Sequence, residues 1–368
     1  MERVIISGID MHDDSLVCKT GCSKDEPTTN RFGNSVSGRK QYFRHLRRIS
    51  NAQGNARIVV AYEASTQGFC LYDDCQDAGI ECYILAPTKM RKSKKERKTK
   101  SDETDALLIF EILRGHVLAG NKLPSIWIPD DQTRLDRETV RSRLDLGLKL
   151  TVVKTQVQTL LKAHRLSKPA DVSKTWTKPY RKWLVGQSKH WPALATLTRQ
   201  IASVEHEITL LNAEVEELSK SMRYAQPCVD LVEKIKGVGL LTAMVYLTEM
   251  GDLSRFKSRQ KLGSYLGLAP SSSESGQTDD RKGHITREGS SRVRRVLCQA
   301  TWSHVRCGGE SAPSYERIVK RNPKHKKIAV VAVMRQLGVR MWHVGLEAQR
   351  RGDVFGNEVI QAKEQKVA

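Results

Sequence analysis

Four acidic side chains have the types and spacing of a metal site that works on phosphate. Asp10 closes the first apolar run of the chain, and Glu63 closes a later β-branched run. Asp102 and Asp105 are three residues apart and follow Ser101, which can cap a helix, so both acids lie on one helical face. Four converging carboxylates repel one another unless cations neutralise them, and oxygen ligands select Mg²⁺ or Mn²⁺. The set therefore predicts a divalent-metal centre suited to two-metal phosphoryl transfer.

Each acid also has a simpler structural explanation. Asp102 and Asp105 can complement a helix dipole, and Asp10 can begin a turn. The order of the four favours the metal interpretation, because ligands of open α/β sheets collect outside the strand ends.

A strongly basic run precedes the acidic pair. Residues 88–100 hold eight Lys or Arg and one Glu. Such a run is expected to contact nucleic-acid phosphates and to deliver the backbone to the metals, although a solvated loop or a localisation tract has the same composition. Aromatic residues make up only 6% of the chain, so phosphate contacts are expected to outweigh base stacking. The predicted contact residues are Lys89, Arg91, Lys92, Lys94, Lys95, Arg97, Lys98 and Lys100.

A glycine-containing turn lies in the C-terminal third. Ile235 to Leu240 is similar to the turn of a helix-hairpin-helix, in which Gly237 and Gly239 would let backbone amides reach a phosphate. A plain turn between two helices accounts for these glycines equally well.

A Ser-rich loop at residues 270–290 leads into an arginine-rich helix. A serine hydroxyl attacks phosphate only where it is deprotonated and cations offset the phosphate charge. Chemistry alone does not choose among Ser271, Ser272, Ser273 and Ser275, and a flexible polar loop is the alternative. The cations expected to contact nucleic acid here are Arg281, Lys282, Arg287, Arg292, Arg294 and Arg295.

The acids require an N-terminal α/β domain to position them. Hydrophobic patterning predicts a mixed sheet in a domain of residues 1–127. The expected strands are 4–9, 15–19, 28–33, 58–63 and 81–85, with helices at 38–49, 69–78 and from Ser101 to Leu113.

Long helices follow in residues 128–226. One helix is expected at 130–164, then a polar stretch at 165–192, and then apolar residues in alternating steps of three and four, which are typical of a coiled coil. The two helices can pair within the chain or across a dimer. The repeat is Leu194, Leu197, Ile201, Val204, Ile208, Leu211, Val215, Leu218 and Met222.

Residues 227–352 form a third predicted domain, mainly helical, with a further polar loop at 308–324. Residues 353–368 are expected to form a flexible tail.

The charge composition indicates what kind of molecule the protein binds. The chain has 368 residues and 62 Lys plus Arg against 41 Asp plus Glu, a net charge of +21, which favours a polyanionic partner. With no apolar stretch near 18 residues and no signal-peptide pattern, we expect a cytoplasmic protein that has no membrane partner. The eight cysteines form no CxxC pair, so neither a zinc site nor a disulfide framework is indicated.

Taken together, these residues resemble the bridge-RNA-guided insertion-sequence recombinases. The N-terminal marks are Gly8-Ile9-Asp10, Tyr62-Glu63-Ala64 and Ser101 to Ala106. The C-terminal marks are Ile235 to Gly239, Gly267 to Pro270, Glu274-Ser275-Gly276 and the Arg-rich helix after Gly289.

The resemblance implies an RNase H-like (RuvC-like) Asp-Glu-Asp-Asp domain at the N-terminus, central coiled-coil helices and a C-terminal serine-bearing domain. Asp10, Glu63, Asp102 and Asp105 would bind metal, and Ser275 would form a transient phosphoserine bond to DNA. The implied partners are donor and target double-stranded DNA, a structured guide RNA, and further copies of the chain in a homodimer or homotetramer. Such a protein would associate with the nucleoid of a bacterium or archaeon. After Glu63 the sequence departs from the family's commoner pattern, because Ser65-Thr66-Gln67-Gly68 replaces Thr-Gly.

Three other functions fit parts of the pattern. A metal-dependent nuclease similar to a Holliday-junction resolvase would use water as the nucleophile, and a non-catalytic nucleic-acid-binding protein would use the acids structurally. A sugar kinase or actin-like ATPase would need glycine-rich phosphate loops, which the sequence lacks.

Overall fold

The computed structural model describes residues 3–23, 25–90, 101–272 and 282–352. The chain divides into two compact units, Met1–Ile128 and Pro129–Ala368. Within the described residues, no helix combines the length and apolar character that crossing a membrane requires.

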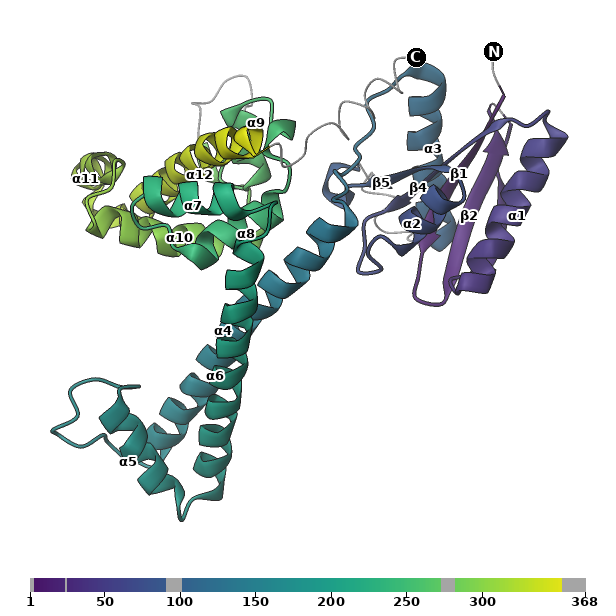
Figure 1. Ribbon diagram of the computed structural model, residues 1–368. Helices are drawn as coiled ribbons and strands as arrows, with labels where there is room; N and C mark the ends of the chain where they lie inside the picture. The colour runs from purple at the N-terminus through teal and green to yellow at the C-terminus, as the bar shows by residue number, and fades with distance from the viewer. Residues whose placement is uncertain (1–2, 24, 91–100, 273–281, 353–368) are drawn as a thin grey trace. The chain divides into compact units, whose positions relative to one another are not determined.

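The first unit is built on a five-stranded mixed sheet with the strand order β3-β2-β1-β4-β5 (Figure 1). Strand β1 is antiparallel to β2 and parallel to β4, while β3 and β5 extend the two sides. The mixed sheet predicted from the sequence is thus confirmed. The strands are β1 (Val4–Met11), β2 (Ser15–Cys22), β3 (Thr28–Gly33), β4 (Arg57–Glu63) and β5 (Glu81–Leu85).

Helices cover both faces of this sheet. Side chains alternate between the faces of a strand, so Ile5 and Ile9 of β1 belong to one core and Val4 and Ile6 to another. The first core includes α1 (Val36–Ala52) and α2 (Cys70–Asp77), and the second includes α3 (Asp102–Ala119). The short helix η1 (Pro87–Lys89) follows β5.

Two long helices open the second unit and pack side by side within the chain (Figure 1). They are α4 (Asp131–Ala163) and α6 (Pro192–Ser219). Val153 and Val157 of α4 share a buried core with Leu194 and Ile201 of α6. The apolar repeat is therefore interpreted correctly up to Leu218, whereas Met222 lies beyond the end of α6 and is 95% exposed.

The polar stretch between these helices contains a helix that the sequence analysis did not predict. Helix α5 (Lys178–Ser188) has Pro179 in its first turn, where proline is tolerated. It buries Tyr180 and Leu184 in the core between α4 and α6.

The remaining helices of this unit share one core, into which Val140 and Leu144 of α4 also pack. Two predicted loops are corrected here. The loop at 308–324 contains α11, whose partly buried Tyr315 packs on the core, and the loop at 270–290 contains the two-stranded sheet β6-β7. The elements are α7 (Ala225–Lys234), α8 (Leu240–Met250), η2 (Leu253–Arg255), α9 (Arg259–Tyr265), β6 (Pro270–Ser272), β7 (Lys282–Ile285), α10 (Ser291–Arg306), α11 (Ala312–Arg321), η3 (Pro323–His325) and α12 (Lys326–Arg351).

Candidate metal centre

Strand β1 directs its even-numbered residues toward α3. A Cβ atom on Gly8 would lie 2.3 Å from the Phe110 nitrogen and 2.5 Å from the Ala106 oxygen, so only glycine permits this close approach of strand and helix. Asp10 follows two residues later on the same face. The tight contact at Gly8 thus fixes how near the start of α3 comes to Asp10.

Glu63 ends the neighbouring strand on the same face as Asp10. Strands β1 and β4 are parallel, with Ile9 paired to Tyr62, so the next residues of the two strands also lie side by side. Paired residues of adjacent strands point to the same face. The carboxylate of Glu63 is therefore on the α3 side of the sheet.

Helix α3 begins as the sequence predicts. The Ser101 hydroxyl caps the helix by accepting a hydrogen bond from the Thr104 nitrogen at 3.2 Å. Asp102 and Asp105 both lie in the first turn, and their spacing of three residues puts them on one face of the helix. Glu103 points elsewhere, since its carboxylate accepts from Arg31 at 3.1 Å and lies 3.8 Å from the Lys19 amine.

Asp10, His12 and Asp102 come together as an acid–histidine cluster. The Nε2 atom of His12 lies 3.2 Å from Asp10 Oδ2 and 3.5 Å from Asp102 Oδ2. One ligand atom from each residue lies within 4.8 Å of the other two. Within the part of the chain that the structure describes, this cluster contains neither Glu63 nor Asp105. Glu63 lies on the same face of the sheet as Asp10, and Asp105 lies on the same face of α3 as Asp102.

The donor set of the cluster fits a divalent cation. Two like charges about 4 Å apart repel by roughly 4 kcal/mol at an effective dielectric constant near 20. A cation among the three ligand atoms would offset that repulsion, and carboxylate oxygens with an imidazole nitrogen are common ligands of divalent metals. Asp10 is only 18% exposed, whereas His12 and Asp102 are 44% and 47% exposed, so the cluster is open to a substrate on one side.

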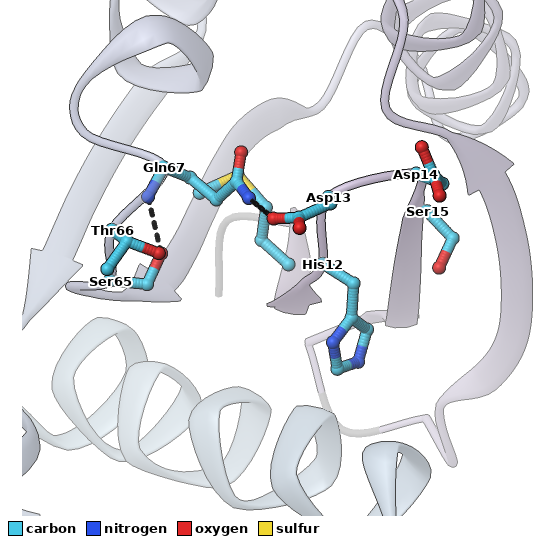
Figure 2. Close-up of a pocket in the computed structure, with 8 residues that line it drawn as sticks. His12, Asp13, Asp14, Ser15, Ser65, Thr66 and Gln67 are labelled. Carbon is cyan, nitrogen blue, oxygen red and sulfur yellow. Dashed lines mark hydrogen bonds between the residues drawn. The ribbon is translucent and has the colours of Figure 1, made fainter.

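An open pocket of about 450 Å³ lies beside the cluster, lined in part by His12, Asp13, Asp14, Ser65 and Gln67 (Figure 2). The amide of Gln67 donates a hydrogen bond to the Asp13 carboxylate and so links the loops after β1 and β4. The Gln67 backbone nitrogen donates to the Ser65 hydroxyl at 3.3 Å. The turn after Glu63, where the sequence departs from the commoner pattern, is therefore internally hydrogen-bonded.

Several predicted residues fall outside the described part of the chain. These are the proposed nucleophile Ser275, with Ser273, and the basic residues Arg91, Lys92, Lys94, Lys95, Arg97, Lys98, Lys100 and Arg281. Lys89 ends η1, and Lys282 begins β7.

The structure places the predicted C-terminal residues in different settings. Gly237 has a positive φ of 84°, and a Cβ there would lie 2.4 Å from the His304 nitrogen, so close packing against α10 requires this glycine. Gly239 precedes α8 and has open space around it. Arg292 donates to Asp145 at 3.0 Å, and Arg294 donates to the Gly289 carbonyl at 2.6 Å.

The other two arginines differ in exposure. Arg287 is exposed, and Arg295 is half-buried.

Two features of the structure were not predicted from the sequence. His12 was detectable, because it lies two residues beyond Asp10 and strand alternation puts both on one face. The second is the basic corner, defined as the exposed cations from the end of α11 to the start of α12. Its members are Arg317, Lys320, Arg321, Lys324, Lys326 and Lys327.

Comparisons with known proteins agree with the order of these parts. Residues 7–165 match the transposase family DEDD_Tnp_IS110, and residues 229–316 match the family described as "Transposase IS116/IS110/IS902 family". A Sinorhizobium fredii protein named "Putative transposase y4qE" is 28% identical over 80% of this chain and 76% of its own length.

Two further relatives carry informative names. The transposase for insertion sequence element IS1533 of Leptospira borgpetersenii is 22% identical over 93% of this chain and 95% of its own length. The pilin gene-inverting protein of Moraxella bovis is 25% identical over 65% of this chain and 64% of its own length. The two family matches follow one another without overlap. The first covers most of the unit that holds the acid–histidine cluster and continues through α4, and the second runs from α7 into α11. The chain belongs to the IS110/IS116 family of transposases, which recombine DNA.

Proposed function

We propose that this transposase cuts and rejoins the DNA of an insertion sequence with Asp10, Glu63, Asp102 and Asp105 as its metal-binding acids. The observation that carries the proposal is the convergence of Asp10 and Asp102, which are 92 positions apart in sequence, at the carboxyl end of β1. A bound Mg²⁺ or Mn²⁺ would neutralise the scissile phosphate and the developing charge on the leaving oxygen. The first unit would then be an RNase H-like (RuvC-like) domain.

Ser275 is the proposed nucleophile. Its oxygen would form a bond to phosphorus while one phosphorus–oxygen bond of the DNA breaks, so the number of phosphoester bonds stays the same. The serine proton passes to a base, and the leaving DNA oxygen takes up a proton. The reverse reaction with a new DNA hydroxyl rejoins the strand without an external energy source.

The name of one relative favours a reaction that rejoins cut DNA strands over simple hydrolysis. Inversion of a gene, the activity named for the Moraxella bovis relative, requires that each cut strand be joined again. A nuclease that uses water releases its product and conserves no bond energy.

Further parts of the proposal concern partners. A guide RNA transcribed from the non-coding end of the element would specify donor and target DNA, and a homodimer or homotetramer would combine the acids of one copy with the serine of another. The net charge of +21 and the basic corner support nucleic-acid binding.

The test combines two variants with a matched control. Asp10→Asn and Asp102→Asn should each remove Mg²⁺-dependent strand exchange, because the amide cannot supply the negative charge that the cation requires. Asp77→Asn, on α2 at the opposite face of the sheet, should retain wild-type exchange. Normal exchange by wild-type protein in excess EDTA would refute the metal role.

The serine is tested separately. Ser275→Ala should yield no covalent protein–DNA species on a denaturing gel and should still bind DNA, whereas Ser273→Ala should form the adduct. A normal adduct in Ser275→Ala would refute the assignment. DNA cleavage without any adduct in the wild type would instead favour the nuclease that uses water.

A further inference from the structure

We propose that His12 is a nitrogen ligand of the cation in the acid–histidine cluster and makes the centre favour transition-metal ions over Mg²⁺. This inference rests on the proposed metal-dependent function. It adds a fifth protein ligand to the four acids that the sequence indicates.

The backbone places His12 on the side of the sheet that holds the acids. Gly8, Asp10 and His12 follow one another at intervals of two along β1 and its immediate continuation, so they share the face toward α3. A residue at this position meets the first turn of α3, where Asp102 lies. The imidazole therefore reaches carboxylates from two different elements.

The orientation of His12 differs from that of its neighbours. Its Nε2 atom faces both Asp10 and Asp102, at 3.2 and 3.5 Å. The Asp13 carboxylate instead accepts a hydrogen bond from Gln67, and the His12 ring turns away from that pair (Figure 2). Of the consecutive residues His12 and Asp13, only the histidine joins the cluster.

Hydrogen bonds hold the backbone of His12 at this point. Its nitrogen donates to the Ser15 oxygen at 2.8 Å, and its carbonyl accepts from the Asn34 side chain at 2.7 Å. These bonds tie the residue to β2 and to the turn after β3. The ring thus starts from a fixed Cα position, and a cation needs only a small adjustment of side chains to contact all three ligand atoms.

The nitrogen changes which cation the centre prefers. Mg²⁺ binds oxygen and gives up its water reluctantly, whereas imidazole is a good ligand for first-row transition ions. An all-oxygen version of the cluster should therefore discriminate less between Mn²⁺ and Mg²⁺. His12→Asn provides that version, since its amide oxygen can occupy part of the same space.

The experiment uses the full-length protein without a histidine tag, with Mn²⁺ as the probe. Electron spin-echo envelope modulation detects the ¹⁴N nucleus of an imidazole that is bound directly to Mn²⁺. The wild type should show this modulation, His12→Asn should lose it, and His116→Asn, on the same domain, should keep it. Calorimetry should show the Mn²⁺ affinity falling by about tenfold or more in His12→Asn, because loss of even a supporting group costs roughly 10- to 100-fold in affinity. The Mg²⁺ affinity should fall by less, because Mg²⁺ gains little from the nitrogen.

The outcomes separate this inference from the proposed function. If Mn²⁺ binds the wild type, Asp10→Asn abolishes binding, and no ¹⁴N modulation is seen, His12 is not a ligand and the metal function stands. If Mn²⁺ does not bind, or binds equally to Asp10→Asn, both proposals fail. His12→Ala serves as a second variant if circular dichroism shows that His12→Asn does not fold.

Discussion

Two pairs of acidic side chains, one pair in each unit, lie in opposite surroundings. In the second unit, Glu249 is only 7% exposed, and Arg141 donates to its two oxygens at 2.6 and 3.0 Å. Asp230, equally buried, accepts from Lys234 at 2.8 Å and also from Arg351. In the first unit, Asp10 and Asp102 lie near each other and share one imidazole.

The difference indicates different roles. An acid bonded to arginine inside a helical core contributes to folding, because removal of one partner leaves a charge in a poorly hydrated place. Asp10 at a strand end and Asp102 at the start of α3 instead lie near each other with no arginine or lysine between them in the cluster, among the residues that the structure describes, and Asp102 is 47% exposed. Such a pair contributes less to folding and attracts a cation. Substitution of Glu249 or Asp230 should therefore lower stability and leave metal affinity unchanged. Substitution of Asp10 or Asp102 should lower metal affinity and change stability little.

The largest effect on stability is expected at Glu249. Glu249→Ala removes both hydrogen bonds to Arg141 and should lower the free energy of unfolding by about 2–3 kcal/mol, below the full value for a buried pair because Arg141 is partly exposed. Asp102→Asn should change the same quantity by less than about 0.5 kcal/mol in metal-free buffer, since relief of repulsion from Asp10 offsets the lost helix-dipole interaction. Urea denaturation measures both. Equal losses in the two variants would remove the distinction between the units.

In the first unit, the contact between Gly8 and α3 should affect both stability and metal affinity. Gly8→Ala would press a methyl group against the backbone of Phe110 and Ala106, which cannot move without shifting α3. We expect a loss of roughly 1–3 kcal/mol in unfolding free energy, together with weaker Mn²⁺ binding because Asp102 shifts away from Asp10.

Gly186→Ala is the matched control for this substitution. It lies in helix α5 with open space around it, and alanine should raise stability by up to about 1 kcal/mol there. Mn²⁺ affinity unchanged in Gly8→Ala would show that the contact does not position the acids.

The first unit was largely predictable because regular backbone places its site. Strand alternation and the cap at Ser101 are local properties of the sequence, and together they bring Asp10 and Asp102 to one place. His12 follows from the same alternation. Its role was not predicted because a histidine among acids has no motif that marks it, and the distance to Asp102 depends on the tertiary contact at Gly8.

The second unit shows where local patterns fail. Helices α5 and α11 are short, and isolated helices below about 12 residues are marginal without tertiary packing. Tyr180 of α5 and Tyr315 of α11 supply that packing by contacting other helices. In sequence, the prolines and polar residues around them indicate loops instead.

Substitutions in the basic corner test whether the second unit contacts DNA through its positive charges. Replacing Lys320, Arg321 and Lys324 by Gln should weaken binding to duplex DNA and reduce the slope of log affinity against log salt by up to about 2.7, or roughly 0.9 for each phosphate that is no longer neutralised. Lys220→Gln is the control, because Lys220 already pairs with Glu217 at 2.7 Å. The slope can be measured by fluorescence anisotropy between low and moderate salt. An unchanged slope in the triple variant would exclude the corner from the DNA-binding surface.

The smallest effect on stability is expected where α5 packs against α4 and α6. Here Glu205 of α6 lies between Arg181 of α5 and Lys154 of α4. The hydrogen bonds from Arg181 lower the pKa of Glu205, against a smaller effect of burial. A carboxyl whose pKa is lower in the folded state stabilises the fold above its ordinary pKa, near 4.3, and loses that contribution as the pH falls through the folded value. Because the side chain is 27% exposed, water screens the pair and the contribution should not exceed about 1 kcal/mol. Glu205→Gln should therefore be less stable than wild type at pH 7, and the difference should shrink at pH 3, as read from urea midpoints at the two pH values. A difference that persists undiminished at pH 3 would mean that Glu205 supports the helices through packing, and that acids of the second unit do not all act through their charge.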